Sequence, residues 1–300
     1  MKTRTPNHRR SSALAGTLFL LPALLVVSLL LFYPVVSSIY YSFTNKHLTK
    51  SRLEFVGLAN YQAIFTDPDF LHAFLVSVNW TLASLAGQIL VGFTAALALH
   101  RIQHLKGLFR TLLIIPWAFP PIVIAMSWKW ILNGVYGFLP NLLMQTGLVQ
   151  EPPEFFSSPN LVFPTLVCIN IWFGAPLIMV NVLSALQTIP RDQYEAAQID
   201  AATSWRTFRH ITLPHIRVVV GLLVVLRTIW VFNNFDTIYL LTGGGPANLT
   251  QSVPIYAYDT GWGLKQLGRS SAVTVVLLGF LMIVTTLYFR LLNKWEKEAD

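Results

Sequence analysis

The sequence predicts an all-α integral membrane protein with six transmembrane helices. Of its 300 residues, 54% are hydrophobic and only 11% are charged, whereas roughly a quarter of the residues are charged in an ordinary soluble domain. Long stretches, among them 11–45, 70–100 and 155–190, contain no Asp, Glu, Lys or Arg. A helix needs about 20 mostly apolar residues to cross the hydrocarbon core of a bilayer, so these stretches are long enough to span a membrane.

The apolar stretches divide the chain into six expected spans. The first begins after a basic N-terminus and resembles a secretory signal, but the apolar run continues from Ala13 through Val36 without a small-residue cleavage site, which indicates an uncleaved span. We therefore expect an N-terminal segment 1–13, a six-span domain 14–291 and a tail 292–300. The spans are expected at 14–36, 71–99, 108–132, 161–186, 216–241 and 271–291.

The distribution of Lys and Arg predicts the orientation. Short loops rich in these residues stay on the cytoplasmic side of the membrane. The N-terminus, the loops after the second and fourth spans, and the tail together hold 14 of the 21 Lys and Arg residues, and the opposite side holds 5. Both termini should therefore be cytoplasmic.

Several other classes of protein are excluded by the composition. The net charge of +8 comes from short segments between apolar runs, without the basic and aromatic stripe of a nucleic-acid-binding domain. Cys168 is the only cysteine, so an intrachain disulfide and a multi-Cys metal site are impossible. The histidines form no HExxH motif, and no phosphate-binding G-K-[ST] loop or nucleophile-base constellation is present. We expect no catalytic residue, no metal and no nucleic acid.

The third expected span contains three prolines, Pro116, Pro120 and Pro121. Proline lacks a backbone donor and breaks the helical hydrogen-bond ladder. Such a break is tolerated within a membrane only where neighbouring protein or a cavity satisfies the freed groups. We expect this span to be kinked or interrupted.

The loop between the fourth and fifth spans, 187–215, is long enough to hold structure of its own. Pro190, followed by Asp192 and by Glu195 three residues later, resembles a capping box in which Asp replaces Ser or Thr. An alanine-rich stretch follows, and a second helix start is expected at Thr203 and Ser204. Two short helices joined by a turn would fit a groove on a partner protein. The alternative is a solvated amphipathic hairpin on the membrane surface.

The same loop carries a resemblance to a known family. Glu195-Ala196-Ala197, three residues, Ala201, nine residues, then Ile211-Thr212-Leu213-Pro214 resembles the EAA loop of permease subunits in binding-protein-dependent ABC importers. The spacing agrees throughout, with one departure. Position 201 is Ala where the family pattern has Gly, and a turn with positive φ would cost about 1 kcal/mol or more with a Cβ present.

Three other segments resemble the carbohydrate-importing branch of this family, of the maltose and glycerol-3-phosphate permease type. They are Phe55–Tyr61, Asp67–Phe70 and Leu240–Pro246. The family places the third of these on the outer side, where the solute-binding protein docks. Together with the loop, they make the resemblance extend over most of the chain.

The resemblance implies a set of partners. It implies a second permease subunit in a heterodimer, two ATPase subunits that bind ATP and Mg, and an extracytoplasmic solute-binding protein, all at a bacterial inner membrane. This chain itself would bind no cofactor. The loop would dock in a cleft of an ATPase subunit, with the Glu195 carboxylate paired to a basic residue there. The expected docking residues are Glu195, Ala196, Ala197, Asp200, Ala201, Leu213 and Pro214.

The fifth expected span contains polar residues that are costly in lipid. At 100° per residue they fall within one half of the helix, which must face protein or water. Amides and carboxylates bind hydroxyls and an indole stacks on a sugar ring, so they suit a sugar, polyol or glycerol phosphate. The alternative is that they only join the spans by hydrogen bonds. The candidate substrate-path residues are Arg227, Trp230, Asn233, Asn234, Asp236 and Thr237.

The sequence therefore predicts a permease subunit that forms half of the translocation path of an ABC importer, driven by ATP hydrolysis in its partner subunits. The alternative is a self-contained secondary transporter that uses Arg227 and Asp236 as an intramembrane charge relay. Six spans are few for an inverted-repeat transporter that works alone.

Overall fold

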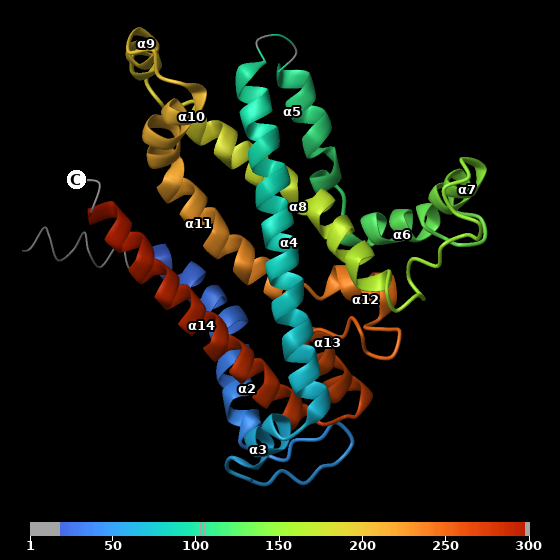
Figure 1. Ribbon diagram of the computed structural model, residues 1–300. Coiled ribbons are helices and arrows are strands. Elements are labelled where there is room, and N and C mark those ends of the chain that lie inside the picture. The colour runs from blue at the N-terminus through green and yellow to red at the C-terminus, as the bar shows by residue number, and fades with distance from the viewer. Residues whose placement is uncertain (1–18, 103, 105, 298–300) are drawn as a thin grey trace, which may run out of the picture. The chain divides into compact units, whose positions relative to one another are not determined.

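A computed structural model describes residues 19–102, 104 and 106–297. For 106 and 293–297 it describes the backbone only. The described chain is almost entirely helical (Figure 1), with one isolated antiparallel bridge between Thr44 and Phe55. The expected segment 1–13 and the first residues of the first span lie outside the described residues. Contacts divide the chain into two units, one with 19–66 and 257–277 and the other with 67–256 and 278–297.

The first unit holds the first expected span and the outer loop after it. The span is helical over Phe19–Ser42 and includes the π-helix η1 (Ser28–Phe32) and α2 (Tyr33–Ser42). The helix α3 (Ala59–Phe65) follows. The Nδ2 of Asn60 donates to the carbonyls of Ser42, at 2.8 Å, and Thr44, at 2.9 Å. This amide ends α2 and fixes the loop, which gives the Phe55–Tyr61 motif a structural role.

The unit also contains the π-helix η4 (Asp259–Gly263) and the beginning of α14 (Leu267–Lys297). The outer loop is joined to this segment by backbone hydrogen bonds from Leu48 N to Lys265 O and from Gly268 N to Lys46 O, both 2.9 Å. A Cβ on Gly268 would lie 2.1 Å from the carbonyl oxygen of Thr44, so the close approach requires glycine.

The second unit is built on three long helices that pack side by side, α4 (Pro68–Arg101), α8 (Val162–Leu186) and α11 (Leu213–Phe232), as Figure 1 shows. Asp67 begins α4, because its side chain accepts a hydrogen bond from Asp69 N at 2.9 Å. Small residues let α4 and α8 approach closely: a Cβ on Gly92 would lie 2.6 Å from Ala175 O.

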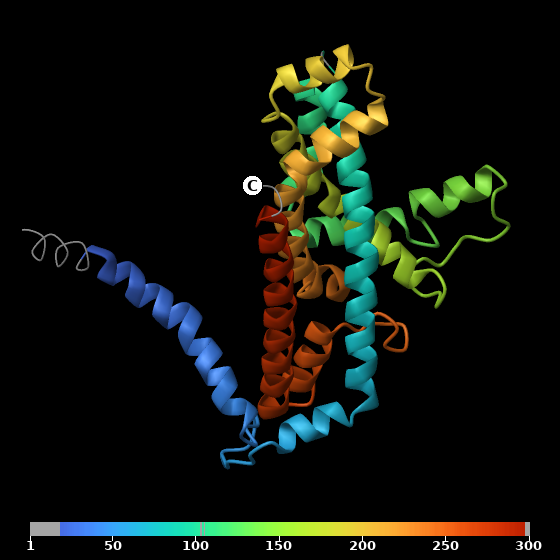
Figure 2. The same cartoon turned by 60° about the vertical axis from the view of Figure 1, so that its left-hand side comes forward.

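The third expected span is broken, as the prolines predict. The helix α5 (Lys106–Ile114) and the 3-10 helix η2 (Ile115–Ala118) end before Pro120, and α6 (Pro121–Ile131) begins there. The helical pair is bent by 96°. In Figure 2, α6 extends away from α4 and leads to α7 (Phe138–Gln145).

The fifth expected span, 216–241, lies within the spanning segment Ser204–Thr242, but its helix is interrupted. It is divided into α11 and α12 (Asp236–Thr242) by a break at 233–235. The Nδ2 of Asn233 donates to Ile229 O at 2.9 Å, and the Oδ1 of Asn234 accepts from Thr237 N at 3.2 Å. Two asparagine side chains thus compete with the backbone ladder and end one helix and begin the next.

The number of spans agrees with the prediction if the bent pair counts as one. Five helices in the described chain are long and apolar enough to cross a membrane, or six with the pair 107–131. The five are Phe19–Ser42, Pro68–Arg101, Val162–Leu186, Ser204–Thr242 and Leu267–Leu292. The short helix α13 (Val253–Tyr258) lies between the last two of them.

Candidate functional site

The loop 187–215 folds as two short helices, as expected from its sequence. The first, α9 (Arg191–Ile199), begins directly after Pro190. The expected capping box does not form, because no side chain caps this end and Asp192 already lies in the first turn of the helix. A proline at the cap fixes φ for helix entry, and the acidic residue interacts favourably with the helix dipole instead.

The second short helix, α10 (Ser204–Thr207), begins as predicted. The Oγ1 of Thr203 accepts a hydrogen bond from Arg206 N at 3.3 Å. This helix continues through the π-helix η3 (Phe208–Thr212) directly into α11. A helical rod therefore runs from the loop into the fifth span.

The turn between the two helices places Ala201 at a φ of 49°. The N–H of Ala202 donates to Ala197 O at 2.9 Å and the N–H of Ala201 to Gln198 O at 3.1 Å. This is the Schellman pattern, which ends helices with a left-handed residue, usually glycine. Position 201 thus adopts the backbone that the family glycine would adopt, and its Cβ makes the turn strained by about 1 kcal/mol.

The predicted docking residues lie on the outside of the loop. Glu195, Ala196, Asp200 and Ala201 are exposed, whereas Ala197 is buried. Leu213 and Pro214 form the first turn of α11 and are exposed as well. Two large apolar side chains that the sequence did not single out are also exposed, Ile199 at 86% and Trp205 at 68%.

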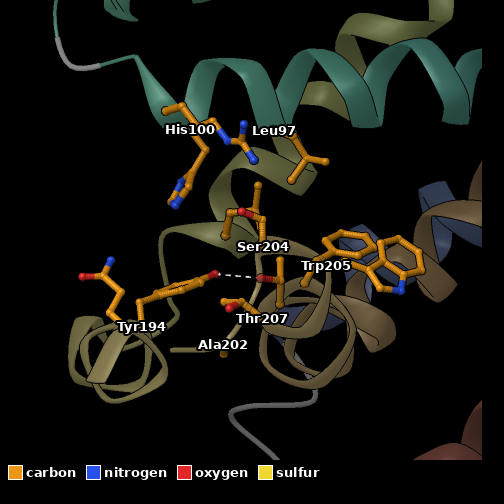
Figure 3. A pocket seen from close by; sticks show the side chains of 12 residues that line it. Leu97, His100, Tyr194, Ala202, Ser204, Trp205 and Thr207 are labelled. Atoms are coloured by element: carbon orange, nitrogen blue, oxygen red, sulfur yellow. Dashed lines mark hydrogen bonds between the residues drawn. The ribbon is translucent and has the colours of Figure 1, made fainter. Parts of the chain in front are cut away.

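Two pockets adjoin the loop. The first, about 760 Å³, lies between the loop and the end of α4, with His100 and Leu97 facing Tyr194, Ser204 and Trp205 (Figure 3). The second, about 530 Å³, is lined by residues of α9, α10, η3 and the turn after α9, which include Ala196, Ala197, Asp200, Arg206 and His210. Three predicted docking residues thus line a concave surface beside two basic side chains.

Side chains that sequence reasoning missed hold the loop in place. The hydroxyl of Tyr194 lies 3.0 Å from the Oγ1 of Thr212. Phe208 stacks on Trp205, with ring centroids 5.7 Å apart, and meets Phe93 of α4 edge to face at 6.1 Å. Tyr194 directly precedes the EAA motif in the sequence. An aromatic residue in an otherwise polar helix was the signal in the sequence that this side chain has a packing role.

The predicted substrate-path residues separate into two groups. Trp230, Asn233 and Asp236 are exposed and Asn234 is half-buried. Arg227 and Thr237 are buried, at 5% and 8% exposure. The exposed residues lie within three residues of the break between α11 and α12 or in the break itself.

Arg227 points into the packing of the three long helices. Its Nε and Nη2 donate to the Oε1 of Gln88 on α4, at 3.0 and 2.7 Å, and Gln88 Nε2 donates to Asn170 O of α8 at 2.9 Å. Gly174 leaves the space for this cluster, because a Cβ there would lie 2.4 Å from Arg227 Nη2. The guanidinium also lies 5.8 Å from the ring centre of Trp230.

The structure thus defines a multi-span membrane protein with a structured loop that leads into one of its spans. The sequence matches the family described as "Binding-protein-dependent transport system inner membrane component" over residues 88–297, and the chain belongs to this family.

Individual relatives agree with the family. The chain is 34% identical over 281 residues to the sulfoquinovosyl glycerol transport system permease protein SmoG of Agrobacterium fabrum, covering 93% of this chain and 91% of the relative. It is 32% identical over 286 residues to the trehalose/maltose transport system permease protein MalF of Thermococcus litoralis, covering 95% and 96%.

The fold agrees with a solved structure of a bacterial ABC transporter involved in the import of the acidic polysaccharide alginate. The TM-score is 0.84 at 20% sequence identity, and the match covers 96% of this chain and 97% of that one. The protein is therefore a multi-pass inner-membrane permease subunit of an ABC importer. The alternative of a self-contained secondary transporter is not supported, and in the described chain Arg227 bonds to Gln88 rather than to Asp236.

Proposed function

We propose that this permease subunit forms half of the translocation path for a carbohydrate or a related polyol or glycerol phosphate. The main support is its similarity, along nearly the whole chain, to permeases named for sulfoquinovosyl glycerol and for trehalose and maltose. The chemistry of the exposed residues at the helix break supports the same class of solute. An indole stacks on a sugar ring, and amide and carboxylate groups bind its hydroxyls.

In this proposal Trp230, Asn233, Asn234 and Asp236 contact the solute. Arg227 and Thr237 act from behind this surface, since both are buried. The guanidinium of Arg227, 5.8 Å from the Trp230 ring, fixes the indole by a cation–π contact.

The ATP-driven step enters through the loop 187–215. In this proposal α9 occupies a cleft of an ATPase subunit, Glu195 pairs with a basic residue there, and both termini are cytoplasmic. A second permease completes the path, an extracytoplasmic binding protein delivers the solute, and ATP and Mg bind to the ATPase subunits. The rod from α10 to Phe232 then transmits the closure of the ATPase dimer to the helix break.

The proposed solute class is tested with the whole importer, purified through this chain and reconstituted in proteoliposomes with its binding protein. ATP-dependent uptake is measured for radiolabelled maltose, trehalose, glycerol 3-phosphate and, as a different class, an amino-acid mixture. We expect uptake of a carbohydrate or glycerol phosphate and none of the amino acids. Uptake of amino acids alone would refute the proposed solute class.

The position of the path is tested by Trp230→Ala, with Trp262→Ala as the matched control. Both indoles are about half exposed, at 52% and 56%, but Trp262 lies in η4, far along the chain from the helix break. We expect uptake to fall at least tenfold for the first variant and to stay near the wild-type rate for the second. Equal rates in the two variants would remove Trp230 from the path.

A further inference from the structure

The interior of the second unit contains a positive charge, that of Arg227, for which the described residues show no negative partner. Arg227 is 5% exposed, and its recorded hydrogen bonds go to the neutral amide oxygen of Gln88. In the part of the chain that the structure describes, no carboxylate forms an ion pair with it. A buried charge without a counter-charge is strongly destabilising, the more so inside a membrane domain.

Two further polar side chains in the same seam lack a partner. Ser84 and Asn170 are buried, at 0% and 1% exposure. The Oγ of Ser84 and the Nδ2 of Asn170 make no hydrogen bond. Buried polar groups in native proteins are nearly always satisfied by protein, water or a ligand. These two orphans therefore indicate an occupant.

The register of the helices places each of these two residues one turn from a residue that contacts Arg227. Ser84 lies one helical turn from Trp80 and one turn from Gln88, on the same face of α4. Both of these neighbours bond to α11: the Nε1 of Trp80 donates to Val231 O at 3.0 Å, and the Oε1 of Gln88 accepts from Arg227. Ser84 consequently faces α11 at the level between Val231 and Arg227.

Asn170 lies on the third side of the same seam. It precedes Gly174 by one turn of α8, and Gly174 abuts both Gln88 and Arg227. Its backbone carbonyl accepts from Gln88 Nε2 at 2.9 Å. Arg227, Asn170 and Ser84 thus lie on three helices, α11, α8 and α4, that pack against one another.

We propose that this seam binds a small inorganic anion, chloride in the cell, between Arg227, Asn170 and Ser84. The guanidinium of Arg227, the Nδ2 of Asn170 and the hydroxyl of Ser84 can each donate a hydrogen bond, and the amide oxygen of Gln88 already accepts twice from Arg227. A donor set with a net positive charge selects an anion over a cation. Because the three residues are nearly fully buried, a saccharide does not fit in this conformation. The site is structural and does not include the groups proposed to contact the solute.

The decisive variant is Gln88→Glu, which supplies a fixed carboxylate to Arg227 and should replace the anion. Ser84→Ala removes one donor without leaving a large void. Ser184→Ala is the matched control, since the Oγ of Ser184 is exposed and already donates to Val180 O at 2.9 Å. None of these residues is placed in the solute path or the docking loop.

The experiment measures equilibrium binding of ³⁶Cl⁻ to the complete importer in nanodiscs, and the thermal unfolding midpoint in chloride against gluconate at equal ionic strength. We expect wild type and Ser184→Ala to bind about one more chloride per copy of this chain than Gln88→Glu, and to unfold at a higher temperature in chloride. Ser84→Ala should bind chloride about tenfold more weakly, since a hydrogen bond to a charged group contributes that order of free energy.

Two results would overturn the proposal. One is wild-type chloride binding no greater than that of Gln88→Glu, which would mean that water fills the seam. The other is a difference between the midpoints in chloride and in gluconate that is the same for wild type and for Ser84→Ala. This comparison can be made even if Gln88→Glu does not assemble.

Discussion

The hydroxyl of Tyr194 lies 3.0 Å from the Oγ1 of Thr212, and this contact joins the exposed helix α9 to the segment that continues into α11. The first helix of the loop, α9, is therefore attached to the fifth span in two ways. One attachment is the chain itself, which runs through α10 and η3 into α11, and the other is this hydrogen bond. Without the second, α9 could rotate about the strained turn at Ala201.

Tyr194→Phe is predicted to loosen the coupling without preventing assembly. The loss of one hydrogen bond costs about 1 kcal/mol, so the ATPase subunits should still co-purify while the amount of solute transported per ATP hydrolysed falls. Thr212→Val should have the same effect, and the double variant should be no worse than either single one. Tyr136→Phe, in an exposed position of the loop before α7, is the control. Fully additive losses would contradict a direct contact.

Ala201→Gly is predicted to stabilise the loop. The backbone at this position has a φ of 49°, which glycine adopts without the steric cost of a Cβ, and the gain is about 1 kcal/mol. We expect slower proteolysis of the loop in the isolated subunit and uptake equal to or above that of wild type. Ala201→Val should act in the opposite direction. Faster proteolysis of the glycine variant would show that the left-handed turn does not limit loop stability.

Gly174→Ala is predicted to destabilise the three-helix seam. The added Cβ would lie 2.3 Å from Gln88 Cδ and 2.4 Å from Arg227 Nη2, so the buried cluster must shift. Overpacking of this kind costs about 1 to 3 kcal/mol. Gly279→Ala is the matched control, because nothing lies within 4 Å of its added Cβ. The measurement is the thermal unfolding midpoint of the detergent-solubilised subunit, and equal midpoints for the two variants would contradict the packing at Gly174.

Glu195→Ala is predicted to abolish uptake. The carboxylate is exposed in this subunit, which leaves it free to pair with an ATPase subunit. Removing one member of a pair that becomes buried costs about 3 to 5 kcal/mol, enough to weaken the complex or uncouple it. Glu151→Ala, an exposed residue in the loop after α7, should transport normally. Unimpaired uptake by the first variant would remove Glu195 from the docking surface.

The membrane architecture was predictable from the sequence because charge-free runs and prolines act locally. The kink at Pro120 and Pro121 and the helix start at Thr203 follow from single residues and their backbone preferences. The break at 233–235 was missed, because a helical wheel assumes a continuous helix. Two adjacent asparagines were the signal for it, since their side chains compete with backbone hydrogen bonds.

The candidate site was predictable only in part. The positions of the loop residues follow from a motif of fixed spacing, and the structure places most of them on the surface of the loop. The burial of Arg227 was not predictable, because it depends on Gln88 and Gly174, which are 139 and 53 residues away along the chain and meet Arg227 only through helix packing. The one signal in the sequence was Gln88 itself, because a single glutamine in an apolar span indicates a hydrogen-bond partner on another helix.

The central claim, that this chain docks an ATPase through the loop 187–215, is tested most directly by crosslinking. Cys168 is the only native cysteine, so Cys168→Ser provides a background in which Ala196→Cys, on the exposed loop, is compared with Leu148→Cys, in the exposed loop after α7. A short thiol-to-amine reagent is applied to the intact complex, and adducts are identified by mass spectrometry. The account predicts an adduct with a Walker-motif ATPase subunit from position 196 and none from position 148. An ATPase adduct from position 148, or none from position 196 in a complex that still contains the ATPase, would contradict it.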